Sequence, residues 1–248
     1  MRWQSIYWAG AVWHDGCRGS AGGVLQVADS DEENWLKVWS GLGERLRCLA
    51  EVKEKRGQLA SAETMYLRAS TYFRVALMCY TDLNRNPMVQ KICVRSHQCY
   101  EKYLQLSDYP GSFVEIPYEG TTLPGHFYRS PVAQEKAPLM ILVAGRDTWL
   151  RTRADVDGLL KRGIHCLTFD GPGQGYALRQ QGLPFRPDWE KVMSPVIDFA
   201  LSCDPGIDTT RIGAMGFSFG AFLLPRACAF DKRIKVCVVD PATSTGRT

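Results

Sequence analysis

The second half of the chain contains four runs of mainly apolar residues that alternate with helix-compatible segments. The runs are Pro138–Ala144, Ile164–Asp170, Arg211–Gly216 and Ile234–Asp240. A continuous apolar run is typical of a strand that is buried on both faces, whereas a strand with one face in water alternates apolar and polar residues. Buried strands separated by helices predict a parallel sheet with right-handed crossover connections.

The third run leads directly into Gly216–Gly220, which reads GFSFG and places Ser218 between a strand and a helix that begins near Phe219. A tight strand-to-helix turn strains the backbone at its apex and leaves no room for side chains two residues away, so glycines are needed there. We therefore predict that Ser218 is a nucleophile and that the Phe219 N–H can receive an oxyanion. A chance match in a glycine-rich chain is the alternative, and the flanking strand and helix weigh against it.

A predicted hairpin precedes the buried strands. Residues alternate in character over Phe113–Tyr118 and Leu123–Tyr128, with a turn at Glu119 and Gly120 between them. A hairpin that enters a parallel sheet, with a nucleophile after the third parallel strand, is the order of the α/β-hydrolase fold. We predict an α/β class protein with this fold.

The segment Asp170–Gly175, DGPGQG, also invites a dinucleotide-binding interpretation. We reject it because its glycines are spaced by two and because the polar, proline-broken segment that follows is not expected to open a helix. A loop at the carboxyl edge of the sheet that lines a pocket fits better. A plain connecting turn is the alternative.

Residues 1–107 are predicted to be helical. Three amphipathic helices are expected at about 29–49, 61–80 and 88–106, and the first has an apolar stripe of Trp35, Trp39, Leu42, Leu46 and Leu49. Such helices need a partner surface, so we predict an N-terminal helical cap over 1–107 and a hydrolase core over 108–248. A tetratricopeptide array is disfavoured because no 34-residue repeat is present.

Composition excludes several classes of partner. The net charge is +4 and the basic residues are scattered, so no nucleic-acid partner is expected. No apolar run approaches the roughly 20 residues of a membrane span, and the N-terminal segment lacks the features of a signal peptide. We therefore predict a cytoplasmic protein without a membrane partner.

Cysteine usage agrees with a reducing compartment. Nine dispersed cysteines without a Cys-x-x-Cys pair favour free thiols over a disulfide framework. Cys93 and His97 are four residues apart, but no second ligand pair follows them, so neither a metal site nor another cofactor is predicted.

Several linked motifs resemble a known family. They are Ser61–Ser70 (SAETMYLRAS), Phe169–Gly175 (FDGPGQG), Gln181–Glu190 (QGLPFRPDWE), Arg211–Gly220 (RIGAMGFSFG) and Pro225–Ile234 (PRACAFDKRI). Together they resemble the α/β-hydrolases of fungal polyketide pathways, which are carbon–carbon hydrolases that shorten naphthopyrone-type polyketides. The bacterial 2,6-dihydroxypseudooxynicotine hydrolase is a relative of these enzymes.

The resemblance implies a Ser-His-Asp site beneath a helical cap. It implies Ser218 as the nucleophile, with Phe219 and the Gly145–Arg146 loop at the oxyanion positions. It also implies a small-molecule substrate, either a polyketide or an aryl ketone or ester, and it leaves a homodimer open.

The remaining catalytic groups are expected to be missing from these 248 residues. In this family the acid and the histidine follow later strands in the order Ser, acid, His. All four histidines, His14, His97, His126 and His165, precede Ser218. We therefore expect an incomplete sheet that lacks the last strands, with the histidine base absent. Asp240 is the only candidate for the acid by position, and a strand-end acid that caps a turn is the competing interpretation.

Three functions remain open at this point. The first is a serine-dependent hydrolase of polyketide metabolism that cleaves a carbon–carbon or ester bond next to a carbonyl. The second is an acyl or polyketide transferase that uses the same serine. The third is a truncated, non-catalytic hydrolase-like protein.

Overall fold

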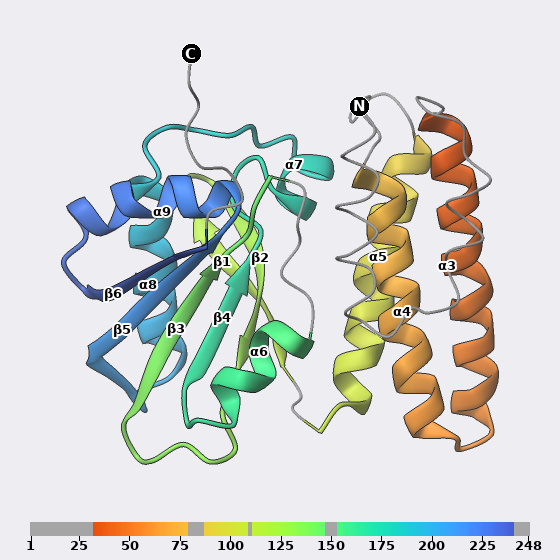
Figure 1. Cartoon of the computed structure of the whole chain (residues 1–248), viewed down its shortest axis with the longest axis horizontal. Coiled ribbons are helices and arrows are strands. Elements are labelled where there is room, and N and C mark those ends of the chain that lie inside the picture. Colours follow the sequence, from red (N-terminus) through yellow and green to blue (C-terminus); the bar gives the residue numbers. More distant parts are fainter. Residues whose placement is uncertain (1–31, 79–86, 109–110, 147–152, 241–248) are drawn as a thin grey trace. The chain divides into compact units, whose positions relative to one another are not determined.

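A computed structural model describes residues 32–78, 87–108, 111–146 and 153–240. The chain divides into two compact units, Met1–Asp108 and Tyr109–Thr248 (Figure 1). Some sequence features lie outside the described residues. These are His14, the first residues (29–31) of the helix expected at 29–49, and the last two (79 and 80) of the helix expected at 61–80.

The first unit consists of three helices, α3 (Glu32–Lys55), α4 (Leu59–Met78) and α5 (Pro87–Leu106), and α4 packs against both of the others. Acidic residues in the first turn of α3 and lysines in its last turn complement the helix dipole. Gly57, at φ +72°, ends this helix, and the Gln58 N–H donates to the Lys53 carbonyl over 3.0 Å. This six-to-one bond is that of a Schellman motif.

The buried face of α3 differs from the predicted stripe. Leu49 is 49% exposed, whereas Leu36, Trp39, Gly43 and Ala50 are buried. A Cβ atom at Gly43 would lie only 2.9 Å from the Phe73 ring of α4. Part of the contact with α4 therefore lies at Gly43, which a search for large apolar side chains does not find.

The second unit contains a six-stranded sheet in the order β1-β2-β4-β3-β5-β6. Its strands are β1 (Ser112–Tyr118), β2 (Thr121–Tyr128), β3 (Ala137–Val143), β4 (His165–Phe169), β5 (Ile207–Phe217) and β6 (Ile234–Asp240). β1 and β2 form the predicted antiparallel hairpin, and β2 also runs antiparallel to β4. The four strands from β3 to β6 are parallel, as the apolar runs predicted. Glu119 and Gly120 have φ values of 40° and 81°, which suit a tight turn of type I′.

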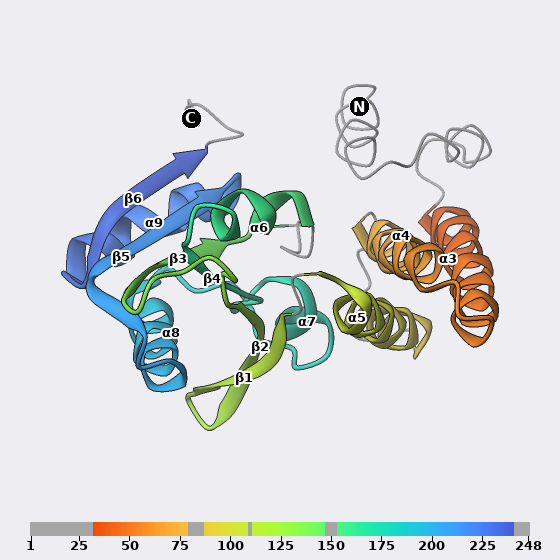
Figure 2. The ribbon, with the colours of Figure 1, turned by 90° about the horizontal axis from the view of Figure 1, so that it is seen from below.

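Helices cover both faces of this sheet. They are α6 (Arg153–Leu160), α7 (Gly175–Arg179), α8 (Glu190–Cys203) and α9 (Phe219–Phe230). α8 and α9 pack together on one face, and α6 lies on the other (Figures 1 and 2). The short α7 was not predicted, and the expectation that no helix opens after Asp170–Gly175 is wrong. The Asp170 carboxylate accepts the Tyr176 N–H over 2.9 Å, which supplies an acceptor at the first turn of α7.

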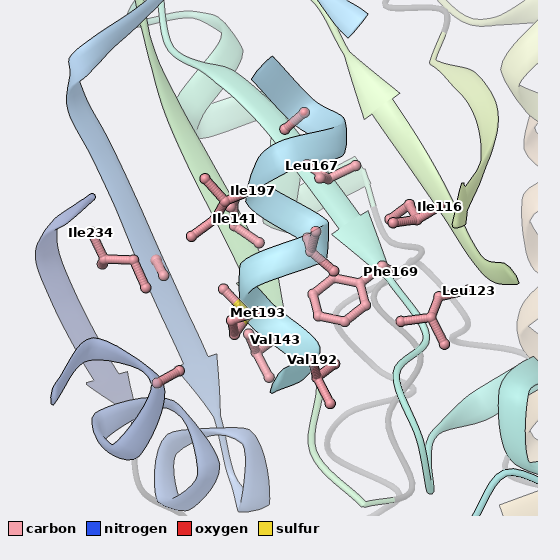
Figure 3. Close-up of a cluster of buried hydrophobic side chains, with 14 of the residues drawn as sticks. Ile116, Leu123, Ile141, Val143, Leu167, Phe169, Val192, Met193, Ile197 and Ile234 are labelled. Carbon is pink, nitrogen blue, oxygen red and sulfur yellow. The ribbon is translucent and has the colours of Figure 1, made fainter. Parts of the chain in front are cut away.

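The core between α8 and the sheet fixes the strands that carry the site. Figure 3 shows Val192, Met193 and Ile197 of α8 over side chains of β3 and β4. These side chains are at most 2% exposed. Burial of each such side chain stabilises the fold by roughly 1.5–3 kcal/mol, so β3, β4 and β5 are held in a fixed register.

The last strand of the described sheet, β6, pairs only with β5. Three of its valines are exposed, Val236 at 54%, Val238 at 37% and Val239 at 45%. Within the described residues, β6 is therefore an apolar edge strand.

Candidate active site

Ser218 lies at the turn between β5 and α9, with φ 52° and ψ −119°. Positive φ is rare for a residue with a side chain, and such a conformation costs about 1–3 kcal/mol. Among the described residues only Glu119 and Ser218 show it without being glycine. The strain lies at the residue that the sequence singled out.

The two flanking glycines allow this turn to form. A Cβ atom at Gly216 would lie 2.5 Å from the Gly220 carbonyl oxygen. A Cβ atom at Gly220 would lie 2.4 Å from the Ala144 carbonyl oxygen and 2.5 Å from that of Val143. Since these neighbours are backbone atoms, they cannot move aside, and the start of α9 can approach the end of β3 only through glycine.

The loop after β3 lies beside the serine. A Cβ atom on Gly145 would lie 3.0 Å from the Ser218 Cβ and 3.4 Å from its Oγ. Gly145 is buried, and Arg146 is exposed. The structure thus brings together Ser218, Phe219 at the start of α9, and the Gly145 loop. Backbone N–H groups in such positions can hydrogen-bond an oxyanion that forms next to the serine.

Sequence reasoning missed Gln174, whose side chain joins the Asp170–Gly175 segment to the loop at Ala144 and Gly145. Its side chain is fully buried, and its Nε2 donates to the Ala144 carbonyl over 2.5 Å. The same Nε2 lies 3.4 Å from the Gly145 carbonyl oxygen, and Oε1 accepts the Gly171 N–H over 3.0 Å. A polar residue within the glycine-rich segment was the available signal, but only the fold shows which loop it reaches.

Three aromatic rings lie next to the nucleophile turn. The Phe219 ring meets that of Phe185 edge-on at 5.0 Å and stacks on that of Phe222 at 5.7 Å between centroids. Phe222 is 76% exposed. The residue after the serine therefore starts an apolar aromatic surface, which suits an uncharged, ring-containing group better than a charged one.

Asp240 ends β6 beside this turn and pairs in register with Phe217. Its carbonyl oxygen accepts the Ser218 N–H over 2.9 Å, and its side chain is exposed. The observed bond to the serine turn involves the backbone of Asp240. Its role as a catalytic acid stays a prediction.

Two histidines of the sheet lie away from Ser218. His165 begins β4 and pairs with Leu139, so it lies at the amino end of the parallel strands, whereas Ser218 follows the carboxyl end of β5. His126 is on β2, three strand spacings from β5, or about 14 Å.

Both histidines have other neighbours. The Nδ1 of His165 accepts the Ser130 N–H over 3.1 Å. The His126 ring lies edge-on to that of Phe113 and is tilted against that of Tyr128. Burial lowers the pKa of His165 below its ordinary 6.5. Neither imidazole is placed to act as the base for Ser218.

None of the described helices combines the length and the apolar character that a bilayer crossing requires. The cysteines described in the structure, which include Cys93, Cys99 and Cys166, carry free thiols.

Known proteins are similar to most of this chain. A family model described as Esterase FrsA-like matches residues 26–243. The Hydrolase acrC of Aspergillus aculeatus is 35% identical over 235 residues, which cover 86% of this chain and 54% of that protein. The 20-hydroxy-prefusarin hydrolase FUS2 of Gibberella moniliformis is 32% identical over 225 residues, which cover 86% of this chain and 53% of that protein.

One solved structure is also similar to this chain. The crystal structure of the 2,6-dihydroxy-pseudo-oxynicotine hydrolase is 26% identical, with a TM-score of 0.69, over 81% of this chain and 55% of that one. The chain spans about half the length of the curated relatives it matches.

Proposed function

Because the chain belongs to the FrsA-like esterase family of α/β-hydrolases, we propose that Ser218 is its nucleophile and attacks the carbonyl carbon of a small-molecule ester or ketone. The observation that carries this proposal is the strained backbone of Ser218, whose side chain lies against Gly145. The backbone strain at Ser218 costs free energy and lies beside candidate oxyanion donors. A turn that served only to connect β5 and α9 would not need this strain.

The chemistry would follow the usual order for a serine nucleophile. Ser218 Oγ forms a bond to the carbonyl carbon while a general base takes its proton. The carbonyl oxygen becomes an oxyanion, which accepts hydrogen bonds from the Phe219 N–H and from the loop at Gly145 and Arg146. Each such donor stabilises the transition state by about 3–4 kcal/mol.

The general base limits the rate that we expect of these 248 residues. The two histidines of the second unit, His126 and His165, are held elsewhere in the sheet. A neutral serine without a positioned base is a weak nucleophile, and serine and histidine act as a unit. We therefore propose that Ser218 is acylated slowly and that the acyl group on Ser218 is hydrolysed more slowly still.

We further propose a substrate from secondary metabolism, such as a polyketide or an aryl ketone or ester. The printed names of the relatives support this, since they include a 20-hydroxy-prefusarin hydrolase and a 2,6-dihydroxy-pseudo-oxynicotine hydrolase. Cleavage of a carbon–carbon bond needs a leaving carbanion that an adjacent carbonyl or phenol stabilises. The rings of Phe185, Phe219 and Phe222 offer an apolar surface for such a group.

Three finer assignments belong to the same proposal. Hydrolysis is preferred to acyl transfer because the family model and the relatives are named as esterases and hydrolases. Free cysteines support a cytoplasmic location. Residues 1–107 are proposed to serve as a cap for the site, as the sequence motifs suggest.

The test is the release of nitrophenolate from p-nitrophenyl acetate by the 248-residue chain and by Ser218→Ala. We expect slow release with an acetyl group on Ser218, found by peptide mass mapping, and no acetyl group at this position in the variant. Equal release and equal acetylation in both proteins would overturn the proposal. Turnover near the ordinary rate of about 10 per second, lost in Ser218→Ala, would instead reveal a base within the chain, and His126 and His165 would be the first to replace.

A further inference from the structure

A buried side chain of the glycine-rich segment Asp170–Gly175, that of Gln174, hydrogen-bonds the loop at Ala144–Arg146. We propose that Gln174 is a positioning residue that sets the orientation of the two peptide groups whose N–H groups face the oxyanion. The claim that these N–H groups donate to an oxyanion rests on the proposed function of Ser218. The claim that Gln174 orients the loop does not.

Peptide geometry links the observed hydrogen bonds to the donors. A trans peptide is planar, and its C=O and N–H groups point in opposite directions. The Ala144 carbonyl shares its plane with the Gly145 N–H, and the Gly145 carbonyl shares its plane with the Arg146 N–H. The Nε2 of Gln174 lies 2.5 Å from the first carbonyl oxygen and 3.4 Å from the second. The two hydrogens of one amide group can therefore fix both candidate donors.

The Ala144 carbonyl is also confined by the start of α9. A Cβ atom at Gly220 would lie 2.4 Å from this oxygen, so the backbone of Gly220 packs closely against it. The peptide group thus lies between the helix that starts after Ser218 and the amide of Gln174. Removal of the amide would leave the packing in place but would free the peptide plane to rotate.

Gln174 is itself fixed in place. It has no exposed surface, and its Oε1 accepts the Gly171 N–H over 3.0 Å within the same loop. The Asp170 carboxylate holds the other end of the segment by accepting the Tyr176 N–H. A buried carbonyl that loses its hydrogen-bond donor is destabilised, so we expect the loop to shift when Gln174 is changed.

The chemistry of glutamine fits the position because one side chain must donate to a carbonyl and accept from an N–H. Glutamate keeps the acceptor for Gly171 but cannot donate to Ala144 when it is ionised. Methionine has a similar length and provides neither group of comparable strength. Gln174→Glu and Gln174→Met therefore separate the two bonds.

Gln181→Met is the matched control. The Nε2 of Gln181 donates to the Thr122 carbonyl over 2.8 Å, so this variant loses the same type of bond at a position away from the serine turn. Thermal unfolding of the two Gln174 variants and of Gln181→Met shows whether each variant remains folded.

The first readout is the amide resonance and hydrogen exchange of Gly145 and Gly171 in the full chain, measured with ¹⁵N-glycine. We expect Gly145 to shift and exchange faster in both Gln174 variants, and Gly171 to lose protection only in Gln174→Met. Gln181→Met should leave both glycines unchanged. Unchanged Gly145 signals in both Gln174 variants would overturn the inference.

The second readout is the acylation of Ser218 by p-nitrophenyl benzoate and by the matching thionoester. The thionoester develops its charge on sulfur, a weak hydrogen-bond acceptor, so it gains less from aligned donors. We expect both Gln174 variants to slow acylation by the oxygen ester at least tenfold and to lower the ratio of the oxygen ester rate to the thionoester rate. Equal slowing of both esters would show a merely structural role and would contradict the inference.

The two readouts distinguish a failure of the proposed function of Ser218 from a failure of the inference about Gln174. If Ser218 is not acylated even in the unaltered chain, the proposed function fails and the donor role of the loop fails with it. The Gly145 signals would still decide whether Gln174 orients this loop.

Discussion

The backbone N–H of Ser218 donates a hydrogen bond of 2.9 Å to the carbonyl oxygen of Asp240. The turn that carries the serine is therefore attached to the end of β6, which is an edge strand of the described sheet. A shift of β6 would therefore also move the serine turn, because this hydrogen bond joins them.

The exposed valines of β6 predict self-association of the 248-residue chain. An apolar, unpaired edge strand is a template for pairing with another chain, and a lysine on the edge opposes this. Val238→Lys should therefore lower the concentration-dependent association seen by light scattering. Val132→Lys is the control, because Val132 is 61% exposed but lies in a turn. A chain that is monomeric and unfolds cooperatively without any substitution would contradict the prediction.

Replacement of Gly220 should destabilise the second unit. The added Cβ in Gly220→Ala would meet backbone carbonyl oxygens at 2.4 Å and 2.5 Å, and overpacking of this kind costs about 1–3 kcal/mol. Gly158→Ala lies within α6, where the nearest atom is the end of the Arg162 side chain at 3.5 Å. This control should be stabilised by roughly 0.5–1 kcal/mol, because alanine favours a helix more than glycine. Urea unfolding of both variants gives the comparison, and equal effects would contradict it.

Release of the strain at Ser218 should raise stability. Glycine adopts positive φ without the steric cost that serine or alanine carries. Ser218→Gly should therefore be more stable than Ser218→Ala by about 1 kcal/mol, although neither variant should become acylated. If chemical denaturation shows no difference between the two, the backbone at this position is not strained.

Acid should destabilise the second unit through His165. Burial lowers the pKa of this imidazole, an effect that Asp204 opposes and Arg129 supports. The unfolded chain takes up a proton as the pH falls through 6.5, whereas the folded chain resists it. The stability from neutral His165 is thus complete above that pH and is lost as the pH falls toward the lower folded value.

His165→Asn is the variant that tests this. Asparagine can still accept the Ser130 N–H but does not titrate. The unfolding free energy of the variant should vary less than that of the unaltered chain between about pH 7 and pH 5. An identical pH dependence in the two proteins would exclude His165 as the source.

Sequence patterns predicted most of the second unit because its elements carry strong local signals. The turn at Glu119 and Gly120, the four parallel strands, and the serine turn with its glycines were predicted and are present. Of the strands, β6 is not buried as its apolar run suggested, because it is exposed from Lys235 to Asp240. The family resemblance and the α/β-hydrolase fold are confirmed by the matching family model and by the structural relative.

Two of the other three errors share a physical cause. The seam of α3 runs over Gly43 because the Phe73 ring needs the space, and α7 forms because the Asp170 carboxylate accepts the Tyr176 N–H. Gln174 was missed because its partner, the Ala144 carbonyl, is 30 residues away in the chain. Contacts between distant segments decide the α3 seam and the role of Gln174, and a local pattern carries no record of them, whereas α7 depends on a bond that spans only six residues.

The most direct test of the central claim is the site at which a fluorophosphonate modifies the 248-residue chain. The reagent forms a bond between phosphorus and a nucleophilic oxygen as fluoride leaves, and peptide mapping by mass spectrometry locates the adduct. We predict one slowly formed adduct on Ser218, which is absent from Ser218→Ala. An adduct on another residue while Ser218 stays unmodified, or equal labelling of the two proteins, would contradict the claim that Ser218 is the nucleophile.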